Sequence, residues 1–572
     1  MATLQMILSA IPLGYISFVS FCMDFIWISA ITLCVYLVAL SLGRALRRKH
    51  LQKETCVLDL ERLGFRLASK KIKGTAVICG GSVGGLLAAR VCHDHFEDVV
   101  IVEPESWLNS EDARRTDSWN QENRRSRVMQ NDSFQVIMVM GYLILSKLFP
   151  NFEEECKVSG IKIGPHETRT YVSGNAPKRP HAEYGGSLPS TIYASRIGLE
   201  TCLRRLVLGG RYKNIRQIIG TVTGVSRSTS NSNLLDAVTV RTPEGPSSIE
   251  TALVIDCTGP ASAGLKWLRR EGFGFMDSYN QDQLPLDDLK VAYDQKLQYT
   301  TLQFHITPEV ATRLPGLPAP FDECGIIYCL ATDPEKESRC MYTNRVDRNI
   351  IQICFSTMGE CELPTNLDTA KACARSLVTE KPIPQSFFAL LDALDEVRDN
   401  MTCSKVRFIG STHIRYEKGV NLPSNWVALG DSVMTVNPVY GHGITKAFFG
   451  AVCLNVLLQN LTEIHEEFSS LFFRMQADKI IPLWNGTKVG DYWYRTTVPI
   501  PGETLSQGSW LRWYMKQLTI LSFTDDQAGS ALWHVRALLA PSIDALQPGL
   551  IFKVLWNFFK DSVSYRRYKL DE

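Results

Sequence analysis

The sequence predicts an α/β protein with a Rossmann-like fold that follows an apolar N-terminal segment. Three observations predict this class: a glycine-rich turn between two apolar runs at 75–103, two later apolar runs that end near Asp or Gly, and an almost uncharged stretch at 6–42. The 572 residues leave room for two or three structural units. With 45% hydrophobic and 21% charged residues, the composition excludes a wholly disordered or collagen-like chain.

The charge balance and the cysteines exclude further classes. There are 61 Lys and Arg against 59 Asp and Glu, so the net charge is +2, whereas a nucleic-acid-binding protein would usually show a basic excess. We therefore expect no nucleic-acid partner. The 16 cysteines are scattered, without a C-x-x-C pair or a zinc-type spacing, so we expect neither a disulfide scaffold nor a metal site.

The first fifty residues predict a membrane anchor. Between Met6 and Leu42 the only charged residue is Asp24, and Phe25–Leu42 is an uninterrupted run of apolar or small residues. That run is close to the ~20 residues of a membrane-spanning helix. Arginines and lysines follow at 44–53, and such residues favour the cytosolic side. We expect the rest of the chain to be membrane-bound and to face the cytosol.

Other interpretations of this segment remain open. Met6–Met23 could form a second span and turn the anchor into a hairpin, or it could extend the first span. A cleaved signal peptide fits less well, because the basic residues follow the apolar run instead of preceding it. A buried core helix is the remaining alternative.

The segment 73–103 has the layout of a dinucleotide-binding β-α-β unit. Thr75–Cys79 predicts a buried strand, Leu86–Cys92 a helix, and Val99–Val102 a second strand that ends on an acidic residue. The glycines allow a tight turn, the helix N-terminus can hold a pyrophosphate, and the acidic residue can accept from ribose hydroxyls. A serine replaces the middle glycine of G-x-G-x-x-G, and its hydroxyl can donate to phosphate. The predicted cofactor-binding residues here are Gly80, Gly81, Ser82, Val83, Gly84, Gly85 and Glu103.

Two later segments predict strand ends at the same edge of the sheet. Leu253–Gly259 is an apolar strand that ends near Asp and Gly, and Trp426–Leu429 is followed directly by Gly and Asp. The loop 437–443 then leads into another helix N-terminus that points at a ligand. These sites would converge in a doubly wound sheet. The predicted cofactor-binding residues of these segments are Asp256, Gly259, Gly430, Asp431, Pro438, Gly441, Gly443 and Ile444.

Together, the segments GGSVGG, IDCTG and GDS…NPVYGHGIT resemble the three FAD-contacting motifs of single-component (group A) FAD-dependent monooxygenases, the flavoproteins related to aromatic hydroxylases and squalene epoxidase. The resemblance covers about residues 73–560. It implies a Rossmann-like FAD- and NAD(P)-binding fold with an inserted β-sheet substrate region and a helical C-terminal region. It also implies that Asp431 meets the ribityl chain and that the loop 437–443 runs beside the isoalloxazine ring.

Two further segments add arginines to this resemblance. The segment 124–150 is similar to the family's arginine- and glutamine-containing loop, and 193–204 is similar to its S-R-x-x-L-E-x-x-L-R helix. The resemblance implies that Arg125 or Arg127, and Arg196, lie near the flavin. Read without the resemblance, the first segment is a solvated basic loop and the second a surface helix with ion pairs.

The resemblance implies a function as well. NAD(P)H would reduce FAD transiently, and O2 would then give a flavin C4a-hydroperoxide that hydroxylates or epoxidises a substrate. A tethered enzyme can collect its substrate from the bilayer, so we expect a lipophilic small molecule such as a terpenoid, a polyprenylated phenol or a polyketide. The loop residues Tyr440 and His442 are candidates for a catalytic role, and Tyr299 and Tyr342 are weaker candidates in the roof over the flavin.

Three alternatives remain. An FAD-dependent reductase of isoprenoid double bonds, like geranylgeranyl reductases, shares the later motifs. A flavin halogenase needs a lysine between flavin and substrate and carries a W-x-W-x-I-P segment, but residues 106–146 contain no lysine and that segment is missing. A flavin-binding protein without enzymatic activity is the third.

The predicted organisation is as follows. Alternating patterns at Gln298–Ile306 and Ile350–Phe355 predict strands of the substrate region. Leu550–Val563 has apolar residues at helical spacing and could lie on a membrane surface or pack in a core. The expected parts are an anchor at 1–48, a linker at 49–72, the FAD-binding domain at 73–260 and 402–458, the substrate region at 261–401 and a helical C-terminal region at 459–572.

Overall fold

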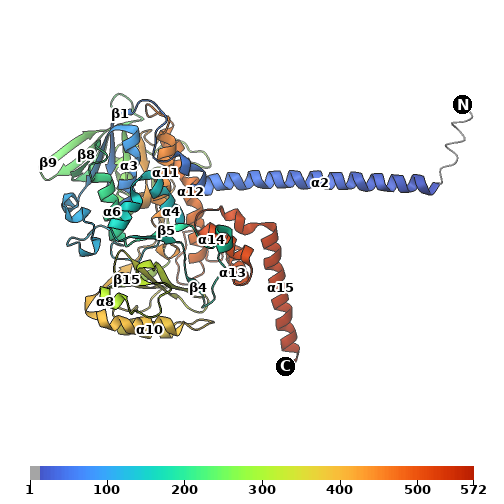
Figure 1. The fold of residues 1–572 in the computed structure, drawn as a ribbon. Coiled ribbons are helices and arrows are strands. Elements are labelled where there is room, and N and C mark those ends of the chain that lie inside the picture. Colours follow the sequence, from blue (N-terminus) through green and yellow to red (C-terminus); the bar gives the residue numbers. More distant parts are fainter. Residues whose placement is uncertain (1–12, 572) are drawn as a thin grey trace, which may run out of the picture.

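The computed structural model describes residues 13–571 (Figure 1). It contains a parallel sheet of five strands, and the glycine-rich turn lies at the carboxyl edge of this sheet. Neighbouring strands of this sheet all run parallel, and the predicted apolar runs form its central strands. The mixed α/β class and the parallel sheet are therefore confirmed. In spatial order the strands are β18 (Trp426–Ala428), β10 (Leu253–Asp256), β1 (Ile72–Cys79), β2 (Phe96–Glu103) and β6 (Ile215–Ile219).

Two helices that pack against each other begin at the carboxyl edge of this sheet. Helix α3 (Val83–His95) follows β1 after a three-residue turn, and α11 (Thr445–Leu458) follows the loop 437–444. Almost every residue of α11 is buried, because α3 and α12 (Phe468–Asp491) both contact it. The fold thus brings two helix N-termini to one edge, as the sequence motifs predict.

A second, six-stranded sheet faces the carboxyl edge of the first. One face of it packs on short helices through Leu302, Phe355 and their neighbours, and the alternate residues Tyr299 and Tyr342 lie on the other face. The strands predicted at 298–306 and 350–355 are its β12 and β15. In spatial order its strands are β16 (Met401–Arg407), β12 (Leu297–His305), β15 (Ile350–Met358), β14 (Arg339–Val346), β13 (Ile326–Ala331) and β4 (Thr170–Val172).

Smaller elements complete this body of the molecule. The three minor sheets consist of β11 (Lys290–Tyr293), β17 (Ser411–Ile414) and β19 (Met434–Thr435); of β3 (Lys162–Pro165) and β5 (Ser190–Tyr193); and of β7 (Thr221–Arg227), β8 (Leu235–Thr242) and β9 (Gly245–Glu250). The remaining helices within it are α4 (Val139–Leu148), α5 (Phe152–Val158), α6 (Arg196–Leu208), α7 (Ala263–Arg270), α8 (Pro308–Ala311), α9 (Leu367–Ser376) and α10 (Gln385–Ala393).

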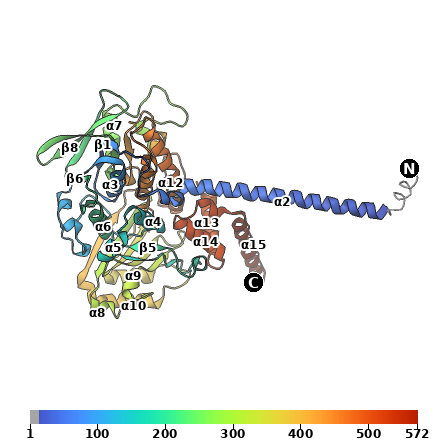
Figure 2. The same cartoon turned by 45° about the horizontal axis from the view of Figure 1, so that its top comes forward.

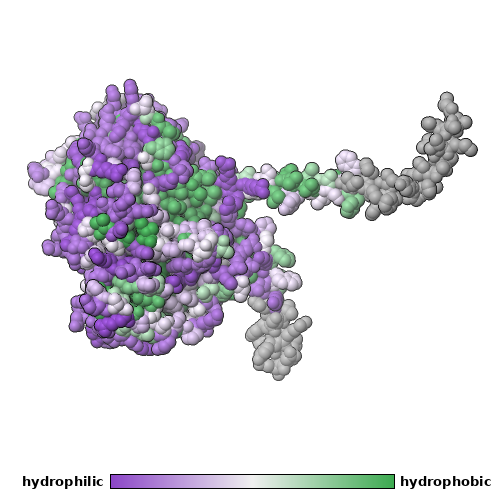
Figure 3. All heavy atoms as spheres, viewed as in Figure 1, coloured by the Kyte–Doolittle hydropathy of each residue, from purple (hydrophilic) through white to green (hydrophobic). Residues whose placement is uncertain are grey.

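The N-terminal helix α2 (Leu13–Glu54) projects away from the rest of the chain (Figure 1). Its 42 residues extend about 63 Å at 1.5 Å per residue. Ser29–Glu54 is long and apolar enough to cross a membrane, and none of its apolar window is buried, so the core-helix interpretation is wrong. A signal sequence would pass the same test of length and composition. Figure 3 shows apolar side chains along its described part.

The helix is continuous through Asp24, which bears on the proposed hairpin. Residues 13–23 extend the same helix instead of turning back, so the extension is the interpretation that the structure supports. Residues 6–12 of the predicted second span lie outside the described residues. The base of α2 contacts α12, and Arg47 pairs with Asp544 through three hydrogen bonds of 2.7–3.0 Å.

The C-terminal region is helical, as expected. After α12 come α13 (Ser509–Leu521), α14 (Asp526–Arg536) and α15 (Pro548–Asp571), and the last of these leaves the body of the molecule. In Figures 1 and 2, α15 and α2 leave the body of the molecule in different directions. Phe552, Trp556 and Phe559 lie on its exposed face, with 61–67% of their surface accessible. The core-packing interpretation of this helix therefore holds only for its inner face.

Candidate functional site

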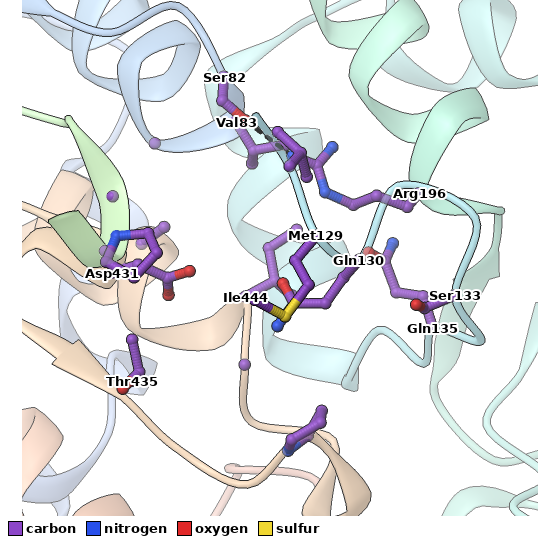
Figure 4. Close-up of a pocket in the computed structure, with 18 of the residues that line it drawn as sticks. Ser82, Val83, Met129, Gln130, Ser133, Gln135, Arg196, Asp431, Thr435 and Ile444 are labelled. Atoms are coloured by element: carbon purple, nitrogen blue, oxygen red, sulfur yellow. Dashed lines mark hydrogen bonds between the residues drawn. The ribbon is translucent and has the colours of Figure 1, made fainter. Parts of the chain in front are cut away.

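A cavity of about 540 Å³ lies between the carboxyl edge of the parallel sheet and the inner face of the six-stranded sheet. Figure 4 shows Asp431 and Thr435 on one side of the view, and Gln130 and Gln135 on the other. Most of the residues predicted from the three motifs and from the arginine-containing segments line its wall. These are Gly80, Gly81, Ser82, Val83, Gly84, Glu103, Arg125, Arg127, Arg196, Gly259, Gly430, Asp431, Pro438, Tyr440, Gly441, Gly443 and Ile444.

The glycine-rich turn has the shape that its sequence predicts. Gly80 has a φ of +116°, and a Cβ there would lie 2.4 Å from the carbonyl oxygen of Cys257. A Cβ on Gly85 would lie 1.9 Å from the carbonyl oxygen of Gly80, so only glycine lets α3 approach the strand. Gly85 itself therefore lies behind the cavity wall. The α3 N-terminus, at Val83 and Gly84, faces the cavity with backbone N–H groups that lack helical partners.

Glu103 closes onto this turn. Its Oε2 accepts a hydrogen bond of 2.8 Å from the backbone N–H of Gly81, and its Oε1 accepts one of 3.1 Å from the N–H of Glu105. Only 2% of the residue is exposed, although it borders the cavity. The carboxylate therefore fixes the turn as well as facing the place where a ribose hydroxyl would lie.

The arginines beside the turn form a buried cluster with carboxylates. Arg125 pairs with Glu103, Glu105 and Glu200, and Glu200 also pairs with Arg196 at 2.7 Å. Burial alone would raise the pKa of Glu200, but its arginine partners hold that pKa well below the usual range. Arg125 is thus fixed within the protein, and its predicted contact with a cofactor has to compete with three carboxylates.

Arg196 and Arg127 keep donors that point to the cavity. Arg196 Nη2 donates to the hydroxyl of Ser82 at 2.7 Å, and that hydroxyl donates to Glu200 at 3.1 Å, so Ser82 is oriented by charged neighbours (Figure 4). Arg127 is exposed on the cavity wall and makes no ion pair among residues 13–571. It is the cation of this segment that is free to meet an anion.

The structure places Asp256 behind the wall. The residue is fully buried, and its carboxylate accepts hydrogen bonds from Thr258 at 2.7 and 2.9 Å, from Ser432 Oγ at 3.1 Å and from the Gly264 N–H at 3.2 Å. Burial raises the pKa of Asp256 in spite of these donors. Asp256 therefore orients the strand end, and Gly259 nearby lines the cavity.

Asp431 faces the cavity, and about a third of its side chain (34%) is accessible. Its Oδ1 pairs with Nζ of Lys446 at 2.6 Å, and the same ammonium group donates to the carbonyl oxygen of Gly443. Sequence reasoning missed Lys446, a buried cation in the first turn of α11. A signal was present in the sequence, because a lysine directly follows the threonine after the glycine loop. A position in the first turn of a helix that begins at the cavity indicates that this lysine could reach the site.

The loop 437–443 is held from behind by a carboxylate on α12. Asn437 Nδ2 donates to Asp491 Oδ1 at 2.7 Å, and the Tyr293 hydroxyl donates to Asp491 Oδ2 at 2.9 Å. Asp491 is completely buried and has no cationic partner among the described residues, so burial raises its pKa to about 7. Tyr440 lines the cavity, and its hydroxyl also approaches Asp491.

The two predicted catalytic candidates differ in position. Tyr440 is on the wall, whereas His442 is not among the residues that line it, and burial together with Arg536 and Lys446 lowers the pKa of His442 to about 4. A second histidine, His166, is on the wall, and burial followed by the charge of Arg536 lowers its pKa to about 4. Both imidazoles are therefore neutral at pH 7. His166 was not predicted, because it lies in an irregular segment without a motif.

The opposite half of the cavity is largely apolar and aromatic. The roof candidates Tyr299 and Tyr342 both line it, and burial raises the pKa of each hydroxyl, so both stay protonated. Arg536, the last residue of α14, enters this half from the C-terminal region. Other residues of this half are Phe134, Met138, Ile326, Cys329, Cys354, Ser356 and Phe408.

Comparisons with known proteins agree with this architecture. No protein-family model matches the chain. The protein Rv3254 of Mycobacterium tuberculosis is 22% identical over 456 residues, which are 75% of this chain and 83% of that protein. The flavin-dependent brominase Bmp2 is 12% identical and has a TM-score of 0.50, with 86% of this chain and all of that chain (100%) covered. CmlS, a flavin-dependent halogenase, is 14% identical at a TM-score of 0.48 over 82% of this chain and 77% of that one. The similarity to Bmp2 shows a shared fold.

Proposed function

We propose that the protein is an FAD-dependent monooxygenase that uses NAD(P)H and O2 to hydroxylate or epoxidise a lipophilic small molecule. The observation that carries this proposal is the convergence of three strand-end motifs, from residues 80, 259 and 431, on one cavity whose far half is aromatic. A cofactor held by the motifs would lie against a substrate held by the roof. The fold shared with Bmp2, a flavin-dependent brominase, supports a flavin-dependent enzyme.

The residues present fit FAD. The tight turn at Gly80 and Gly85 leaves no room for side chains and lets a pyrophosphate approach the α3 N-terminus. A Cβ on Gly259 or Gly443 would meet nothing within 4 Å, so both backbones border open space of the kind that a cofactor fills. Gln135 also keeps a buried Nε2 without a hydrogen-bond partner at the cavity wall.

Each part of the cofactor has candidate residues in this arrangement. The N–H groups at Val83 and Gly84 would hold the pyrophosphate, with Arg127 free to add charge, and Glu103 would accept from the adenosine ribose. Asp431 would accept from the ribityl chain through its outer oxygen, while Lys446 holds the inner one. When bound, FAD would supply the redox and oxygen chemistry.

The protein's own residues would orient the reactants and exclude water. Asp491 fixes the loop 437–443 through Asn437, so the backbone of Gly441 and Gly443 would stay beside the flavin ring. Tyr299, Tyr342 and Phe408 would shield the reacting atoms and pack on an apolar substrate. His166 on this wall is neutral at pH 7 and adds no charge.

Membrane attachment belongs to the same proposal. The apolar helix α2 would cross the bilayer, and the basic residues at its base would keep the catalytic part on the cytosolic side. Helix α15 leaves the body in a different direction from α2 (Figure 2), and its exposed Phe552, Trp556 and Phe559 would lie in the lipid interface. The substrate would reach the cavity from the bilayer.

Halogenation is the second candidate, because Bmp2, which shares the fold, is a brominase. A halogenase needs a free lysine between flavin and substrate. Lys446 is the lysine on the described cavity wall, and Asp431 and the Gly443 carbonyl already hold its ammonium group. This pairing disfavours the alternative but leaves it testable.

The deciding experiment uses the full chain purified in detergent and loaded with FAD. NAD(P)H oxidation and O2 uptake are followed with candidate terpenoids, polyprenylated phenols and polyketides, with and without bromide or chloride. We expect the substrate to stimulate both NAD(P)H oxidation and O2 uptake without any need for halide. One oxygen atom should appear in the product. NAD(P)H oxidation without oxygen in the product would indicate the reductase, and an absolute need for halide would indicate the halogenase.

A further inference from the structure

One side chain in the roof half of the cavity stands out by its charge. Arg536 ends α14, and its exposed side chain lines the cavity. The charge of its guanidinium interacts with Tyr342 of β14, Cys329 of β13 and Tyr440 of the loop 437–443. These neighbours surround it with groups that are neutral at pH 7.

Arg536 differs from Arg125 and Arg196, two other arginines of the site, in having no partner among the described residues. Arg125 and Arg196 are neutralised by Glu200 and its neighbours, whereas Arg536 makes no hydrogen bond or ion pair among residues 13–571. The guanidinium stays charged at pH 7. An anion that enters the cavity can therefore pair with it through charge-assisted hydrogen bonds.

The anion is not expected to be the pyrophosphate of a dinucleotide. The pyrophosphate has its own place at the α3 N-terminus, beside Ser82, Arg127 and Arg196. None of the carboxylates near the α3 N-terminus interacts electrostatically with Arg536. The groups that do interact with Arg536 belong to the six-stranded sheet and to the loop 437–443. Arg536 therefore lies at the substrate end of the cavity.

We propose that Arg536 binds an ionised oxygen group of the substrate, so that the substrate is an amphiphilic organic acid. Its carboxylate, or an acidic enol or phenol of equal charge, pairs with the guanidinium, and its apolar body lies against Tyr299, Tyr342 and Phe408. This inference rests on the proposed function and narrows its substrate class: a lipophilic molecule with one anionic end.

The segment that contains Arg536 is connected to the base of α2. Eight residues after Arg536, Asp544 pairs with Arg47 of α2 at 2.7 Å. The short turn that contains Asp544 contacts both α14 and α2, so the segment that supplies Arg536 is braced on the anchor. An amphiphilic acid in the bilayer keeps its charged end at the interface. In the proposed membrane arrangement, the base of α2 would lie at the same interface.

The test is equilibrium binding of two matched probes, 2-naphthoate and 2-naphthamide, to the full chain in detergent at pH 7.5, measured by calorimetry with and without added FAD. The variants are Arg536→Gln and Arg536→Lys. The control is Arg241→Gln, which removes an exposed arginine of β8 that does not line the cavity. A charge-assisted contact is worth about 1.5–3 kcal/mol, so Arg536→Gln should weaken naphthoate binding roughly 10- to 100-fold.

The other arms separate this inference from its rivals. Naphthamide binding should be unchanged in Arg536→Gln, Arg536→Lys should recover part of the naphthoate affinity, and Arg241→Gln should behave as the parent. An equal loss of both probes, or no loss of either, would overturn the proposal. If the chain takes up no FAD but retains the Arg536-dependent preference for naphthoate, the proposed oxidation fails and the anion site stands.

Discussion

Asn437 and Asp491, 54 positions apart in the chain, are joined by a hydrogen bond of 2.7 Å between Nδ2 and Oδ1, and no solvent reaches either residue. The bond ties α12 to the loop that borders the cavity. The Tyr293 hydroxyl, at 2.9 Å, and the nearby Tyr440 hydroxyl complete the surroundings of the carboxylate. A buried carboxylate without a cation makes the loop sensitive to pH.

The first prediction concerns the stability contributed by Asp491. Burial raises its pKa to about 7 in the folded protein, against about 3.9 in an unfolded chain. Between these values the folded state keeps a proton that the unfolded state has lost, so this group's contribution to stability falls as pH rises from about 4 to about 7. Asp491→Asn should flatten the dependence of the free energy of unfolding on pH. The change that Asp491 causes between about pH 4 and about pH 7 is at most a few kcal/mol by order of magnitude. Thermal unfolding of both proteins at pH 5, 6, 7 and 8 measures it.

Asp282→Asn is the matched control, since Asp282 is exposed in a loop. It should leave the pH dependence of unfolding as in the parent. An Asp491→Asn variant whose melting temperature follows the same pH curve as the parent would show that Asp491 is ionised in the folded protein.

The second prediction concerns the glycine turn. In Gly85→Ala the new Cβ would lie 1.9 Å from the Gly80 carbonyl oxygen, so α3 or β1 has to shift, at a cost of about 1–3 kcal/mol or more. FAD content should fall with the melting temperature. Gly486→Ala provides the contrast, because its Cβ meets nothing within 4 Å in the middle of α12, and alanine there should stabilise by up to about 1 kcal/mol. Equal melting temperatures for the two variants would contradict the close approach.

The third prediction concerns Asp431. Asp431→Ala removes the predicted acceptor for the ribityl chain and leaves the buried Lys446 ammonium without its carboxylate. FAD affinity, measured by fluorescence titration of the apoprotein, should fall roughly tenfold or more. Asp431→Asn keeps an acceptor and should lose less. Asp282→Ala should bind FAD like the parent, and full retention of affinity in Asp431→Ala would remove this residue from the site.

The fourth prediction concerns the membrane. A chain without residues 1–42 keeps Arg47 and its pair with Asp544, so the catalytic part should stay folded. It should retain weak binding to phospholipid vesicles through α15. Trp556→Ser in this shortened chain should lower vesicle binding roughly tenfold, because two-thirds of this large aromatic side chain (66%) is exposed. Lys405→Ser, on an exposed position of β16, should change nothing. Vesicle co-sedimentation provides the readout.

How much of this could be predicted from the sequence depends on the range of the interaction. The strand ends at 79, 256 and 428 were readable because an apolar run followed by Gly or Asp is a local pattern, and the topology of a parallel sheet then brings such ends together. The same logic misplaced Asp256. A carboxylate at a strand end can face either the ligand or its own turn, and only the positions of Thr258 and Ser432 decide between them.

Arg536 and Asp491 could not be found this way. Each lies on a helix with ordinary amphipathic character, and its importance comes from what the rest of the chain leaves unpaired around it. Sequence patterns report which face of a helix is apolar. They do not report that a guanidinium lacks a carboxylate partner, because that depends on long-range contacts.

The most direct test of the account is the FAD content of the full chain after purification in detergent. The protein should be yellow, release FAD at close to equal molar amount on denaturation, and take up FAD again when refilled, while Gly85→Ala does so poorly. A colourless protein that binds no added FAD, although it melts cooperatively, would contradict the claim that the three motifs form one flavin site.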